Sequence, residues 1–303
     1  MSIFLSRILA VGLGCLLLGA CASPPKRALD DAARQSPQDR ESVVVIEQGE
    51  LHANIEVSHV ADATGASAGA IGAIIGAIVD SRVNQNRTDA AETGVTPLRN
   101  ALIDYDFDHR ALQATQATLA KMPGFDSTKV AFSKDGTKDH LLRMIDQSGS
   151  SQFLVAKYAY ALSPNFSQIV VSMAADIYPK EVKDGSLSDR VSTRDALYTE
   201  RFWYVESLPH AGKDLNQNAQ LWNQNGSQPA RDALDAGLAG VESLFIRSMS
   251  QTPEAAAALD KGHGTELAGF HGNLVETSEK GTLLYNGETG TWIFVDGQQA
   301  AQK

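Results

Sequence analysis

The chain has 303 residues, of which 43% are hydrophobic and 20% are charged, and its formal net charge is −10 at pH 7. This composition is typical of a globular protein, and the length allows one large domain or two small ones with a buried core. The negative charge repels phosphate backbones and therefore excludes nucleic acid as a partner.

The first twenty residues have the pattern of a secretory signal. Arg7 precedes an apolar run over residues 8–18, and the small residues Gly19 and Ala20 follow it. A charged start, a short apolar core and small residues before a cleavage point are typical of such signals. The run is too short to span a bilayer by itself. Residues 1–20 are therefore predicted to be a signal peptide.

The end of this segment, Leu18-Gly19-Ala20-Cys21, resembles the lipobox of bacterial lipoproteins. The resemblance implies cleavage between Ala20 and Cys21, a diacylglycerol on the Cys21 thiol, and acylation of the new terminus with a fatty acid such as palmitate. Several acyl chains would hold the mature chain stably on a membrane. The absence of Asp after Cys21 implies the outer membrane, with the domain facing the periplasm. The alternative is an ordinary signal, or an uncleaved anchor, that ends in a Cys by coincidence.

Lipidation of Cys21 would also restrict the chemistry of the protein. The only other cysteine, Cys15, leaves with the signal. The mature domain would then contain no disulfide, no cysteine nucleophile and no cysteine-ligated metal. Because Arg7 is the only charge removed, the net charge would change from −10 to −11.

Residues 21–42 are predicted to be a lipidated, flexible tether, because they are polar, contain Pro24, Pro25 and Pro37, and lack an apolar period. Residues 43–94 are assigned to a β-hairpin and a glycine-rich helix. The hairpin is predicted from the apolar run at 43–46, a turn at Gln48-Gly49, and alternation over 51–58.

A stripe of four glycines marks the next segment. At about 100° per residue, the helix-packing candidates fall within roughly 60° on one face of a helix; they are Gly65, Gly69, Gly72 and Gly76. Four glycines in a helix are costly unless they allow close backbone contact. The stretch resembles the glycine zippers of outer-membrane lipoproteins. The uncharged residues 63–79 would give about 25 Å of helix, so association with a membrane and packing on protein both stay open.

Gly65-Ala66-Ser67-Ala68-Gly69 also matches G-x-S-x-G, the nucleophile elbow of serine hydrolases. An elbow requires an apolar strand that runs directly into the first glycine, and residues 61–64 make a weak strand. Ser67 is therefore the alternative catalytic residue, and no other catalytic residue is predicted.

Residues 81–93 are polar and predict a loop, whereas Thr96 and Pro97 predict the start of a helix that runs to about residue 121. Asp104, Asp106 and Asp108 have the spacing that begins a calcium loop, but the glycine and glutamate that such a loop needs are missing. A solvated helix face is favoured over a metal site.

The central region is predicted to contain a strand at 129–132, a helix at 137–147, and strands at 153–162, 166–178 and 196–206, the last three as an antiparallel meander. A polar connector is predicted at 180–194. The clearest helix covers 229–249, with an apolar stripe of Leu234, Leu238, Val241, Phe245 and Ser248. Residues 251–269 predict a linker, and 274–295 predict short hairpin strands.

Together these elements predict an α+β fold: an antiparallel sheet with helices on one face, a glycine-zipper helix, and a small C-terminal β-hairpin unit. Residues 95–250 are assigned to a periplasmic domain, and 251–303 to a linker with hairpins. The element order resembles that of the curli-secretion-channel lipoproteins and of other envelope lipoproteins, and this resemblance adds no site residue beyond Cys21.

The sequence contains no P-loop, no dinucleotide fingerprint and no zinc-protease motif, so no cofactor and no metal is predicted. We therefore expect a non-enzymatic outer-membrane lipoprotein that contacts the membrane through its anchor, and that binds an envelope protein or its own copies. A serine hydrolase using Ser67 and a periplasmic small-ligand binding module are the alternatives. The binding module depends on the aromatic side chains of the meander.

Overall fold

The computed structural model describes residues 29, 39–53, 82–180, 182–183, 186–187 and 196–297. The strands are β1 Arg40–Val45, β2 His52–Ala53, β3 Phe125–Ser133, β4 Gln152–Leu162, β5 Gln168–Pro179, β6 Val182–Lys183, β7 Ser186–Leu187, β8 Tyr198–Ser207, β9 Gly264–Leu267, β10 Phe270–Ser278, β11 Gly281–Asn286 and β12 Thr291–Asp296. The helices are α4 Arg82–Ala101, α5 Phe107–Leu119, α6 Lys138–Gln147, α7 Leu215–Trp222, α8 Gln224–Met249 and α9 Pro253–Ala258, followed by the 3₁₀ helix η2 Leu259–Lys261.

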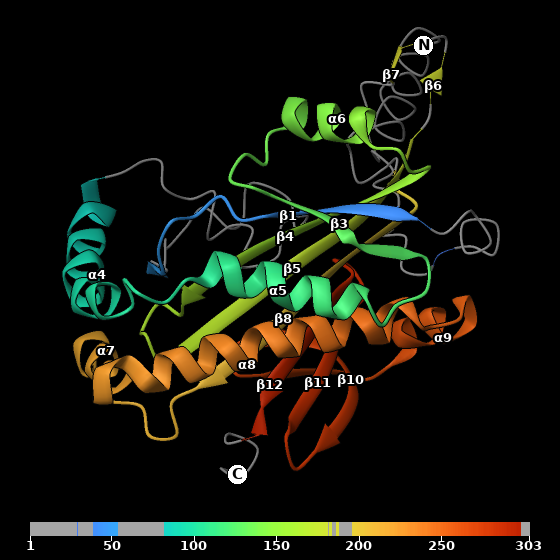
Figure 1. Cartoon of the computed structure of the whole chain (residues 1–303). Coiled ribbons are helices and arrows are strands. Elements are labelled where there is room, and N and C mark those ends of the chain that lie inside the picture. The colour runs from blue at the N-terminus through green and yellow to red at the C-terminus, as the bar shows by residue number, and fades with distance from the viewer. Residues whose placement is uncertain are drawn as a thin grey trace, which may run out of the picture.

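The α+β class is confirmed. Ten strands form one mixed sheet in the order β3-β1-β4-β5-β8-β12-β11-β10-β9, with β2 added alongside β4, whereas β6 and β7 form a separate pair. Figure 1 shows α5 and α8 next to each other on one face of this sheet and α6 on the opposite face. Among the described residues, no helix combines the length and apolar character that a membrane span requires.

The predicted hairpin at 43–57 is wrong in the part that the structure describes, and residues 54–57 lie outside that part. β1 and β2 do not pair with each other; both run parallel to β4, β1 against residues 153–157 and β2 against residues 161–162. Between them, the Gln48 side-chain amide donates to the Tyr160 carbonyl at 2.9 Å and accepts from the Tyr160 N–H at 3.1 Å. This side chain replaces the missing backbone pairing, so the chain continues in one direction instead of reversing.

The central meander is confirmed. β4 pairs antiparallel with β5, and β5 pairs antiparallel with β8. The predicted inward face of β5 is buried throughout; it consists of Ile169, Val171, Met173, Ala175 and Ile177. The predicted stripe of α8 is also buried against this face, because alternation on the strand and the helical period present matching apolar surfaces. Three successive residues with positive φ, at 225–227, interrupt α8, so its regular part begins close to Pro229.

The C-terminal hairpins are part of the main sheet instead of a separate unit. β12 lies parallel to β8, with Trp292 opposite Phe202 and Val295 opposite Val205. The linker predicted at 251–269 is also wrong, because it contains α9, η2 and β9. Domain boundaries drawn at residues 95 and 250 therefore cut a continuous sheet.

The helical boundaries before β3 also differ from the prediction. The expected loop at 81–93 lies almost wholly in α4, and Pro97 lies inside that helix instead of at its start. The expected single helix to residue 121 is divided, because the chain leaves the helical conformation between Ala101 and Phe107. The prediction that the helices cover one face of the sheet is wrong for α6. Its residues Leu141 and Ile145 pack on Val43 and Phe153, on the opposite side of the sheet from α8.

Candidate functional site

The residues that the sequence singled out lie outside the described part of the chain. This applies to Ala20 and Cys21, to Ser67, and to the four glycines of the stripe, Gly65, Gly69, Gly72 and Gly76. Their geometry therefore plays no part in the description that follows.

The three aspartates at 104, 106 and 108 do not converge. Asp106 caps α5 and accepts from the His109 N–H at 3.0 Å. Asp104 pairs with Arg231, and Asp108 pairs with Lys134. Each carboxylate thus has its own structural partner, and within the described residues no group of three or more metal-ligating side chains lies together.

The candidate functional site is the start of β1, where the stretch described continuously from residue 39 joins the sheet. Leu29, which precedes it in the chain, is also buried in the core. Arg40, the first residue of β1, is buried with 3% of its surface exposed. Its Nε donates to Gln152 Oε1 at 2.6 Å, its Nη1 donates to the Gly124 carbonyl at 3.4 Å, and its guanidinium lies 5.1 Å from the centre of the Phe125 ring. Burial lowers the pKa of Arg40 from its ordinary value. The guanidinium therefore connects β1 to the first residues of β3 and β4.

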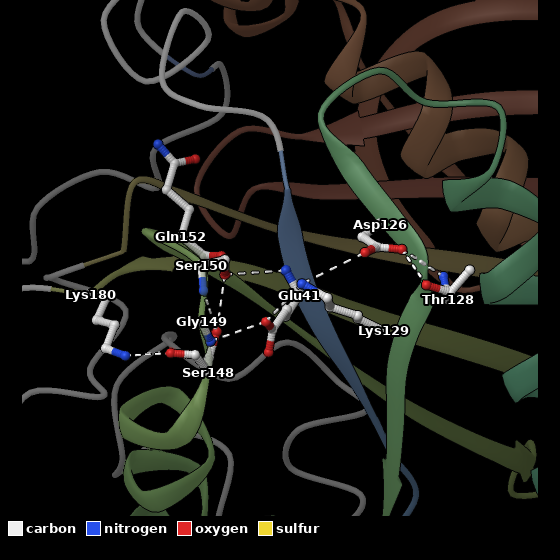
Figure 2. A network of polar contacts seen from close by, with 9 residues as sticks. All are labelled: Glu41, Asp126, Thr128, Lys129, Ser148, Gly149, Ser150, Gln152 and Lys180. Atoms are coloured by element: carbon white, nitrogen blue, oxygen red, sulfur yellow. Dashed lines mark hydrogen bonds and ion pairs between the residues drawn. The ribbon is translucent and has the colours of Figure 1, made fainter.

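The next residue, Glu41, connects the same strand to the α6–β4 turn and to a second point on β3 (Figure 2). Its Oε1 accepts from the Gly149 N–H at 3.0 Å and lies 3.4 Å from Lys129 Nζ on β3. Its own N–H donates to Ser150 Oγ at 3.3 Å. A side-chain carboxylate that accepts a backbone N–H and faces a cation makes charge-assisted contacts, which are stronger than neutral hydrogen bonds.

The contacts of Glu41 continue into the turn between α6 and β4. Ser150 Oγ donates to the Gln152 carbonyl at 2.6 Å, and Lys180, which follows β5, donates to the carbonyls of Asp146 and Ser148 at the end of α6. We call this set the entry network; it consists of Arg40, Glu41, Asp126, Thr128, Lys129, Ser148, Gly149, Ser150, Gln152 and Lys180. It joins the start of β1 to β3, β4, α6 and the end of β5.

The entry network borders an edge of the sheet. In the described part of the chain, β3 pairs only with β1. Ser133 O accepts from Ile46 N at 3.1 Å, so the alternate residues Val130 and Phe132 direct their backbone groups away from β1. Phe132 is 38% exposed. An edge of this kind is where another polypeptide can add a strand.

A second feature is a hollow of about 550 Å³ under the middle of α8. Ala236, Ala239 and Gly240 of α8 line one side, and the stacked rings of Tyr204 and Phe294, 5.3 Å apart, line the other. Gly240 is required here, because a Cβ at this position would lie 2.1 Å from Tyr204 Cδ2. Tyr204 is the one aromatic residue of the predicted meander that lines this hollow, and Phe294 comes from β12.

Two buried glutamates were missed by the sequence analysis. Glu242 on α8 accepts from Thr115 Oγ1 at 2.9 Å and from the Tyr158 hydroxyl, and its burial raises its pKa. Glu200 on β8 accepts from Trp292 Nε1 at 2.6 Å and from Ser248 Oγ. These groups bond to neighbours within the core, which gives them a structural role.

A signal for both glutamates is present in the sequence. Glu200 lies two residues from Tyr198 and from Phe202, on the inward face of an alternating strand. Glu242 lies four residues after Leu238 and three before Phe245, inside the apolar stripe. A carboxylate at an inward position predicts a buried polar contact.

A hollow of about 640 Å³ next to β2 contains His52 and Lys157. Burial, and then the charge of Arg99, lower the pKa of His52, while Lys157 Nζ donates to the Gly136 carbonyl at 3.1 Å.

No protein-family model matches this chain, and no curated protein matches it either.

Proposed function

We propose that this chain is a lipid-anchored envelope protein with a non-enzymatic role in structure, assembly or interaction. Cys21 carries the anchor, the residues between it and β1 connect it to the domain, and the folded domain contacts an envelope protein or its own copies. The lipobox-like sequence before Cys21 and the polar composition of the tether support this proposal. Ala22 and Ser23 after the anchor favour the outer membrane and a periplasm-facing domain.

The observation that carries the proposal is the entry network. The flexible tether predicted over residues 21–42 is wrong at its end, because β1 begins at Arg40, and Leu29 within it is buried in the core. Arg40 and Glu41 fasten the start of β1 to β3 and to the α6–β4 turn. β1 also lies between two parallel neighbours, β3 and β4. A force along β1 would load both hydrogen-bonded ladders together.

A surface for a polypeptide partner supports the interaction role. The outer edge of β3 offers backbone groups close to the attachment point of the tether. The glycine stripe at 65–76 is the second proposed contact, because four glycines on one helix face permit close packing.

Cross-linking in native membranes, followed by purification of the lipidated full chain, tests this role. We expect higher-mass or partner-containing species with the wild type, and their loss when Gly69 and Gly72 are both changed to leucine, while membrane attachment is kept. Gly49→Leu is the matched control, because Gly49 has open space around its Cβ position. Cross-linked species that persist unchanged in the double variant would contradict the proposed contact.

The hollow beside Tyr204 favours a second candidate function, the binding of a small ligand. Its wall of two stacked rings and its volume suit a small organic molecule. Native mass spectrometry of the purified full chain tests this candidate: a reproducible added mass that disappears in Gly240→Leu supports it, and bare protein from several preparations contradicts it.

A further inference from the structure

The C-terminal strands join the central sheet through one ladder. Among the C-terminal strands β9 to β12, β12 is the one that pairs with β8, and β11, β10 and β9 follow it outward. At the start of this ladder, Arg201 N donates to the Gly290 carbonyl at 3.0 Å, and Trp292 donates to the buried Glu200. At the other end, the ladder closes with Val205 opposite Val295.

Two carboxyl groups follow directly at that end. Tyr204 lies opposite Phe294, so alternation places Glu206 and Asp296 on the same face as these rings, as the next neighbours across the two strands. The Tyr204 hydroxyl donates to Asp296 Oδ2 at 3.2 Å. Both carboxyl side chains are half-buried. Like charges at facing positions of neighbouring strands destabilise a sheet.

The surroundings offer little to neutralise this pair. From β5, the residue opposite Glu206 is Ile169, and α8 presents only Ala236, Ala239 and Gly240 to the hollow. The turn between β10 and β11 contributes Glu279 and Lys280, which are exposed at the rim. Within the described part of the chain, no lysine, arginine or histidine forms an ion pair with either carboxyl group.

We propose that the Glu206–Asp296 pair makes the attachment of the C-terminal strands to the central sheet depend on pH. With Glu206 protonated, the pair carries at most one negative charge and the ladder end stays closed. When Glu206 loses its proton, two negative charges face each other across β8 and β12, and the end of the ladder next to the hollow loosens. This inference is independent of the anchored-protein proposal.

The direction of the effect follows from the chemistry of Glu206. Burial, and then the charge of Asp296, raise its pKa from 4.5 to about 7. A carboxyl group whose pKa is higher in the folded than in the unfolded chain stabilises the fold most fully below the unfolded value. That contribution is lost as the pH rises from about 4.5 through about 7. The attachment of β12 to β8 is therefore most stable in mildly acidic solution.

Hydrogen–deuterium exchange of the full chain, corrected for the intrinsic pH dependence of exchange, tests the proposal. Between pH 5.5 and 8.5 we expect the protection of β12 amides to fall about tenfold more in the wild type than in Glu206→Gln, after discounting for partial exposure. Glu279→Gln, an exposed carboxylate of the neighbouring turn, is the matched control and should follow the wild type. Protection of α5 reports whether each variant is folded.

Asp296→Asn provides a second, independent variant. Removal of its charge should move the midpoint of the β12 transition to lower pH, because the pKa of Glu206 then falls. The proposal is overturned if wild-type β12 protection is constant across this range, or if Glu206→Gln retains the wild-type dependence. If Glu206→Gln does not fold, an unchanged midpoint in Asp296→Asn overturns it in the same way.

Discussion

Replacing Arg40 with methionine tests whether the entry network fastens β1. Methionine keeps an apolar stem of similar length but removes the donor to Gln152 Oε1 at 2.6 Å, the longer contact to Gly124, and the cation over the Phe125 ring. A buried hydrogen bond from a charged group contributes about 1.5–3 kcal/mol, and a desolvated cation–π contact contributes about 1 kcal/mol or more. We expect a loss of about 3 kcal/mol.

For a domain of this size, about 3 kcal/mol corresponds to a fall of roughly 6–12 °C in the midpoint of thermal unfolding. Calorimetry of the full chain measures the shift, and hydrogen exchange should show the greatest added opening in residues 40–45 and 125–128. Arg247→Met is the control, because Arg247 is 42% exposed in its pair with Glu276 and should cost less than about 1 kcal/mol. A midpoint for Arg40→Met within one or two degrees of the control would show that Arg40 does not fasten β1.

Three further substitutions test the packing of the core and the contact between β12 and β8. Gly240→Ala should lower the free energy of unfolding in urea by about 1–3 kcal/mol, since the new methyl group overlaps the Tyr204 ring; an unchanged midpoint would contradict the close contact. In Glu242→Gln, the stability deficit relative to the wild type should shrink between pH 5 and pH 8. The reason is that burial raises the pKa of Glu242 in the folded chain, so this carboxyl group stabilises the wild type most below about pH 4.5 and less as the pH rises. A deficit that grows with pH in urea titrations would contradict this expectation. Trp292→Phe removes the donor to Glu200 and should cost about 1–3 kcal/mol in thermal unfolding, and a neutral substitution would show that this hydrogen bond is dispensable.

Local periodicity was sufficient to predict the strands and helices that have one strongly apolar face. The stripe of α8 and the alternation of β5 each repeat over several turns or pairs, so their type and their buried side follow directly. Helix α4 was missed because it is polar overall, although Ala91, Val95 and Leu98 are buried at helical spacing. Pro97 after Thr96 is typical of a helix start, but it lies in the last part of that helix.

Strand pairing was less accessible to sequence analysis. An apolar run such as residues 43–46 predicts a strand but does not specify its partner, and the ladders of β1 with β4 and of β8 with β12 join segments about a hundred residues apart. The Gln48 side chain, which continues the edge of β4 where a turn was expected, depends on a contact with Tyr160 that no local pattern encodes.

The entry network was missed for a related reason. Arg40 and Glu41 are charged residues at the border of a polar segment, where charged side chains are ordinarily solvated. Their burial follows from the convergence of β3, β4 and the α6–β4 turn on the start of β1. The anchor at Cys21, by contrast, is a prediction from sequence alone, because the lipobox is a local motif.

We propose that a lipid on Cys21 holds this domain at a membrane. Mass spectrometry of the N-terminal peptide of the mature protein, purified from its own membrane fraction, tests it most directly. We expect a chain that begins at Cys21 and carries a diacylglyceryl group and an amide-linked acyl chain, and a Cys21→Ala protein that is unlipidated and not cleaved after Ala20. A mature chain that begins elsewhere, or an unmodified Cys21 thiol, would contradict it.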